Sequence, residues 1–135
     1  MKCWQAIGHP FSMWVLYLLI FSFIAIIGAP EIAYLFFVGS GSIVLALSFG
    51  FWTGLKSSKL FQKPLAPAIL NGFILGISIG FISLLLELGV ALLSPGFMST
   101  MAPNIVGMLP ISLGSWAILT MLSSLGSAIG SEFKR

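Results

Sequence analysis

Four long apolar stretches dominate this chain. They cover about residues 11–28, 32–55, 68–93 and 109–129. A helix needs about 20 mostly apolar residues to cross the hydrocarbon core of a bilayer, so each stretch is long enough. Only helices and closed barrels satisfy the backbone inside lipid, and a run such as 15–27 lacks the alternation of a barrel strand. The sequence therefore predicts an all-α integral membrane four-helix bundle.

Charged residues are too few for a soluble globule. They make up 7% of the 135 residues, whereas an ordinary soluble domain has about 25%. The segments between the apolar stretches are too short for another domain. We therefore expect residues 1–135 to form a single membrane domain with the lipid bilayer as its surroundings.

The positions of the cationic residues predict the orientation of this domain. All six lie near the chain ends or between the second and third stretches: Lys2, Lys56, Lys59, Lys63, Lys134 and Arg135. The other two connections contain no lysine or arginine. Because cytoplasmic loops are enriched in these residues, both termini are expected to be cytoplasmic. A multi-pass protein of the plasma or inner membrane fits best, although an organellar or thylakoid membrane is also compatible.

Aromatic and proline residues mark the expected boundaries. Trp4, Trp14 and Trp52 are expected at the cytoplasmic headgroup level, where amphipathic rings concentrate. Ala29-Pro30 predicts a tight turn between the first two spans. Pro110 fits either the first turn of the fourth helix or a kink in a helix that begins near Ile105.

Small residues recur at every fourth position in the second and third spans. The residues are Ser42, Ala46, Gly50 and Gly54, followed by Gly72, Gly76 and Gly80. Residues four apart drift only about 40° around a helix, so each set forms one stripe. Such stripes allow close helix packing in lipid. We expect these spans to pack on each other or on the fourth span, and the bulkier first span to face lipid more. A glycine-lined substrate path is the functional alternative.

Glu87 is the one ionisable residue well inside a span. The helical period places it on the glycine face with Ser83, and chain counting places Tyr34, Ser112 and Trp116 at similar depth. No lysine or arginine lies there, so we expect the carboxyl group to be protonated, hydrogen-bonded or reached by water. It is either a site for a proton, cation or polar substrate group, or a neutral hydrogen-bonding clamp.

The amino-acid composition excludes most kinds of metal-binding and catalytic site. The chain has one histidine, His9, one cysteine, Cys3, and no aspartate. A zinc site of the usual ligand count and a bis-histidine haem are therefore impossible within one chain. Most hydrolytic and transfer mechanisms lack the residues that they need, and the cations are too few and too scattered for a nucleic-acid interface. We predict no catalytic residue, no metal, no cofactor, no nucleic-acid partner and no enzymatic activity.

Two functions fit these patterns. The first is a non-catalytic accessory or assembly subunit of a larger membrane complex, or a scaffold that self-associates through its small-residue helix faces. Its partners would be other membrane subunits or further copies of the chain. The alternative is a small oligomeric transporter or channel that uses Glu87.

Overall fold

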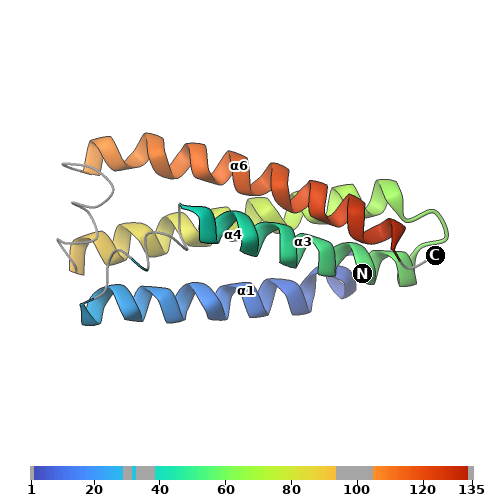
Figure 1. Cartoon of the computed structure of the whole chain (residues 1–135), viewed down its shortest axis with the longest axis horizontal. Coiled ribbons are helices and arrows are strands. Elements are labelled where there is room, and N and C mark those ends of the chain that lie inside the picture. Colours follow the sequence, from blue (N-terminus) through green and yellow to red (C-terminus); the bar gives the residue numbers. More distant parts are fainter. Residues whose placement is uncertain (1, 29–31, 33–38, 94–104, 134–135) are drawn as a thin grey trace.

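Four helices make up nearly all of the structure. The computed structural model describes residues 2–28, 32, 39–93 and 105–133. The helices are α1 (Lys2–Ile27), α3 (Ser40–Leu60), α4 (Leu65–Leu93) and α6 (Ile105–Glu132). They form an elongated bundle in which the start of α1, the turn between α3 and α4, and the end of α6 lie at the same end (Figure 1). The all-α prediction is confirmed.

Three helices are long and apolar enough to cross a membrane. They are Trp4–Ile27 in α1, Leu65–Leu93, which is the whole of α4, and Leu109–Glu132 in α6. Helix α3 is the least apolar, because serines and lysines interrupt it. Part of the predicted second span, 33–38, lies outside the described residues, so the described helix begins only at Ser40.

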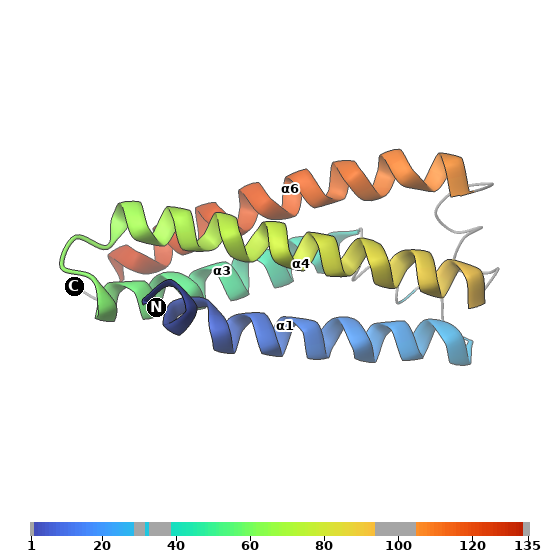
Figure 2. The same cartoon turned by 180° about the vertical axis from the view of Figure 1, so that it is seen from behind.

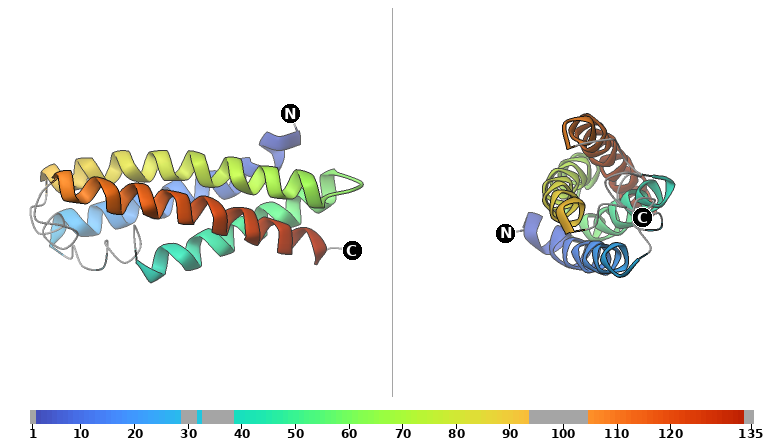
Figure 3. Two further views of the ribbon diagram at one scale, coloured as in Figure 1. Left: turned by 90° about the horizontal axis from the view of Figure 1, so that it is seen from above. Right: turned by 90° about the vertical axis from the view of Figure 1, so that its left-hand side faces the viewer.

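Proline and glycine shape the helix ends. Helix α6 begins at Ile105, so Pro110 lies inside the helix and not in its first turn. Pro10 lies inside α1, which starts well before the predicted span, and α1 bends near its N-terminal end (Figures 2 and 3). Proline lacks the N–H that would continue the helix ladder, which accounts for a bend there. Gly28 follows α1 with φ of 126°, a conformation suited to glycine. The predicted Ala29-Pro30 turn lies outside the described residues.

Helices α3 and α4 lie between α1 and α6 when the bundle is viewed end-on (Figure 3). Large side chains join α1 to α3: Trp14 stacks on Phe49 with ring centroids 5.4 Å apart. Trp14 is only 1% exposed, so its predicted place as a headgroup anchor is wrong, because the stacking draws the indole into the core. Among the three apolar helices, α1 has the smallest buried share, as its bulky residues predicted.

The small-residue stripe of α3 packs on α6. A Cβ at Gly50 or Gly54 would collide with the backbone of Ser123 or Ser127 respectively. Ala46 is fully buried on the same helix. Because neither glycine has a side chain, the two backbones approach closely. At the start of α3, the buried hydroxyl of Ser42 donates to Gly39 O (2.6 Å) in its own chain segment.

The glycines of α4 pack on the same helix. A Cβ at Gly72 would lie 2.6 Å from Ser123 O, and one at Gly76 would collide with Thr120. Gly80 makes room for the indole of Trp116. Thus α6 is the common partner of both stripes, which is the second of the two packing arrangements expected from the sequence. The stripes lie inside the chain and not on its outer surface.

Candidate functional site

Glu87 lies near the C-terminal end of α4 and is 2% exposed. The hydroxyl of Ser83, one helical turn earlier, donates to Glu87 Oε1 over a long distance of 3.4 Å. Glu87 Oε2 is buried and has no hydrogen-bond partner among the described residues. One carboxylate oxygen is therefore weakly satisfied and the other is open to a further partner.

Ser112 brings a second polar group to this carboxyl group from α6. Its side chain is near enough to interact with Glu87, and it is buried. Its Oγ nevertheless makes no hydrogen bond of ordinary geometry with any described residue. The structure thus brings together Glu87, Ser83 and Ser112, three of the four residues of the predicted polar site. The fourth, Tyr34, lies outside the described residues.

The surroundings of this Glu87 site are apolar. Ile79, Val90 and Ala91 on α4 are buried in the hydrophobic core, and Ile111 of α6 packs against it. The described lysine and histidine residues belong to the first part of α1, the last part of α3 and the α3–α4 turn, which lie toward the other end of the bundle (Figure 1). An ionised carboxylate here would therefore have no positively charged side chain near it among the residues that the structure describes.

A second polar cluster lies where α3, α4 and α6 meet, toward the other end of the bundle. Asn71 Nδ2 of α4 donates to Ser57 Oγ of α3 (3.0 Å), and Ser127 Oγ of α6 donates to Ala68 O. Ser123 is fully buried, and its hydroxyl has no partner among the described residues. Asn71 and Ser57 were not among the residues predicted for a polar site. The available signal was spacing, since Asn71 adjoins the glycine stripe of α4 and Ser57 follows Gly54 by almost one helical turn.

Trp116 joins α4 and α6 between the two polar regions. Its indole Nε1 donates a hydrogen bond to the backbone oxygen of Ile77 (3.1 Å). Its ring also packs at a tilt against that of Phe81, with the ring centroids 6.3 Å apart. The sequence predicted Trp116 at the depth of Glu87. In the structure its indole bonds to the α4 backbone at Ile77 and occupies the space beside Gly80.

No metal-binding cluster was found among the described residues, since none brings three or more histidine, cysteine or acidic side chains together. Comparisons with protein-family models, with curated proteins and with solved structures found no match to this chain.

Proposed function

We propose that the chain is a four-span membrane bundle with both ends in the cytoplasm. Three helices have the length and apolarity for this, and α3 runs beside them. Its 21 residues extend about 30 Å at about 1.5 Å per residue, which matches a bilayer core. The described lysines Lys56, Lys59 and Lys63 belong to the last part of α3 and to the α3–α4 turn, which lie at one end of the bundle (Figure 1), as the positive-inside rule requires.

Within this bundle, we propose that the Glu87 site takes up and releases a proton or a small cation, as part of an oligomeric transporter or channel. The observation that carries this proposal is a buried carboxyl group with one oxygen that has no hydrogen-bond partner among the described residues. An unpaired charge in this position is costly, so a proton or a cation must neutralise it. The hydroxyls of Ser83 and Ser112 supply further oxygen atoms for such an occupant.

The experiment is ion flux in proteoliposomes. We expect wild-type protein to move protons, Na⁺ or K⁺ down an imposed gradient, recorded with an enclosed ion-sensitive dye. Glu87→Gln keeps the size of the side chain and removes its charge, so flux should fall by about ten-fold or more, the equivalent of about 1.4 kcal/mol. Glu132→Gln is the matched control, because Glu132 is exposed at the other end of the bundle.

Two results would reject this function. One is wild-type protein that is folded and inserted but moves none of these ions. The other is equal flux in the Glu87→Gln variant and the wild type.

The accessory-subunit prediction is the second candidate, and an apolar groove on the outside of α4 and α6 favours it. Two adjoining cavities of about 440 and 320 Å³ share Phe73 and Met121 as lining residues. The small-residue stripes pack within the chain, so we expect a partner helix to use the outer groove instead. Purification in mild detergent tests this candidate: a stoichiometric membrane partner that Met121→Trp releases supports it, and a chain purified alone contradicts it.

A further inference from the structure

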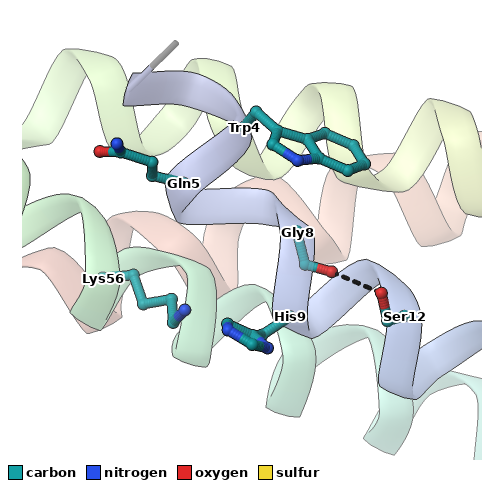
Figure 4. Close-up of a pocket in the computed structure, with 6 residues that line it drawn as sticks. All are labelled: Trp4, Gln5, Gly8, His9, Ser12 and Lys56. Carbon is teal, nitrogen blue, oxygen red and sulfur yellow. Dashed lines mark hydrogen bonds between the residues drawn. The ribbon is translucent and has the colours of Figure 1, made fainter.

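A pocket with several polar residues in its lining lies between α1 and α3, at the end of the bundle where the described lysines gather. It has a volume of about 410 Å³, and its lining includes Gln5, His9 and Ser12 of α1 and Lys56 of α3. Figure 4 shows the Lys56 ammonium group extending toward His9, with Gln5 on the same side of α1. A smaller cavity of about 190 Å³ adjoins it and adds Lys59.

The pocket offers hydrogen-bond donors without an opposing carboxylate. Lysine has three N–H donors, the glutamine amide has two, and the imidazole has at least one. Neither carboxylate side chain that the structure describes, Glu87 or Glu132, lines either cavity. Lys56 Nζ lies 6.0 Å from the centre of the Trp52 ring, a cation–π distance that helps to hold the ammonium group in place. Converging donors of this kind suit an anion with several acceptor oxygens.

The outer surface of α1 continues from this pocket as an apolar strip. Met13, Leu16 and Ile20 follow His9 at helical spacing, and all three are exposed. Trp4 lines the pocket and is 64% exposed, as an indole at the headgroup level would be. A pocket with polar side chains beside an apolar strip matches a molecule with a charged headgroup and acyl chains.

We infer that this pocket between α1 and α3 binds the phosphate headgroup of an anionic phospholipid. Lys56 pairs with the phosphate, Gln5 and His9 donate hydrogen bonds to its oxygens, and the acyl chains lie along Met13, Leu16 and Ile20. This inference rests on the proposed membrane topology and is independent of the role of Glu87.

The test is binding of phosphatidylglycerol to the detergent-solubilised protein, titrated by native mass spectrometry with phosphatidylcholine for comparison. Lys56→Gln should weaken phosphatidylglycerol binding about five-fold, which corresponds to the about 1 kcal/mol that one lysine contributes near an anionic surface. Lys63→Gln is the matched control, because it removes the same charge at the same end and lines neither cavity. It should leave binding unchanged. Gln5→Leu, which keeps every charge, should also weaken binding.

Three results would overturn the inference. Equal weakening by Lys56→Gln and Lys63→Gln would show a diffuse charge effect. No preference for phosphatidylglycerol over phosphatidylcholine would remove the anionic ligand. Displacement of the lipid by millimolar inorganic phosphate would assign the pocket to a soluble phosphate. Circular dichroism shows whether each variant is folded, and retention in membranes after alkaline carbonate extraction tests the topology separately.

Discussion

Gly54 and Gly89 are both helical glycines, yet a side chain would meet opposite surroundings at the two positions. A Cβ at Gly54 would collide with the α6 backbone at Ser127 and would lie 2.8 Å from Ser131 N. A Cβ at Gly89 would meet no other part of the described chain within 4 Å, its own helix backbone aside. The need for glycine therefore comes from the neighbouring backbone and not from the helix that carries it.

We expect Gly54→Ala to destabilise the protein by about 1–3 kcal/mol, the usual cost of overpacking a close interface. Thermal unfolding in detergent, followed by circular dichroism, measures the change. Gly89→Ala is the control and should be neutral or slightly stabilising, because alanine has the higher helix propensity. Equal stability of the two variants would contradict the close approach of α3 and α6.

The hydrogen bond between Asn71 and Ser57 joins α4 to α3, and removing one hydroxyl group breaks it. Ser57→Ala leaves the Asn71 amide without this partner, and we expect a loss of about 0.6–2 kcal/mol, the range for hydrogen bonds between membrane helices. Ser58→Ala is the control, because Ser58 donates to Leu55 O in its own helix and joins no other. The same unfolding measurement applies, and similar losses in both variants would show that the interhelical bond is unimportant.

Among the helices, α6 has the central role in packing because the glycines of both α3 and α4 approach its backbone closely and α4 also accepts one of its aromatic side chains. Toward α3 it presents Gly126 and Gly130, where a Cβ would collide with the backbone of Leu47 and Phe51. Toward α4 it inserts Trp116 over Gly80 and donates a hydrogen bond to Ile77 O. Helix α6 therefore combines close backbone contacts with an inserted aromatic ring.

We expect Gly80→Leu to displace the Trp116 indole and to break its bond to Ile77 O, with a loss of about 1–3 kcal/mol from overpacking. Gly114→Leu is the control, since a Cβ at Gly114 has no neighbour within 4 Å. In a background with the other three tryptophans changed to phenylalanine, Trp116 fluorescence should shift in the Gly80 variant alone. An unchanged spectrum would contradict the insertion.

The proposed arrangement of the whole molecule has both termini and the α3–α4 turn on the cytoplasmic face. In a Cys3→Ser background, Lys63→Cys should react with an impermeant maleimide only after the cells are permeabilised. Val106→Cys, near the start of α6 and exposed, should react in intact cells. Labelling of Lys63→Cys from outside would reverse the orientation, and labelling of both positions from one side would reject the four-span topology.

The order of residues alone was enough to predict the helix content and the lengths of the apolar stretches. It also predicted that Glu87 and Ser83 share one face of a helix. Hydropathy and the helical period are local properties, so neighbouring residues are enough to define them. The same reasoning made Trp14 an exposed headgroup anchor, and that was wrong because its indole is buried against Phe49, which is distant in the sequence.

The pairing of helices required the folded chain. A small-residue stripe can dock on any helix with a matching surface, and periodicity does not say which one accepts it. The choice of α6 as common partner sets Ser112 beside Glu87, and the docking of α1 on α3 sets Lys56 beside His9. Both sites are formed by residues far apart along the chain. They exist because helix packing is decided by the shapes of two surfaces at once, whereas each helix is already encoded within its own segment.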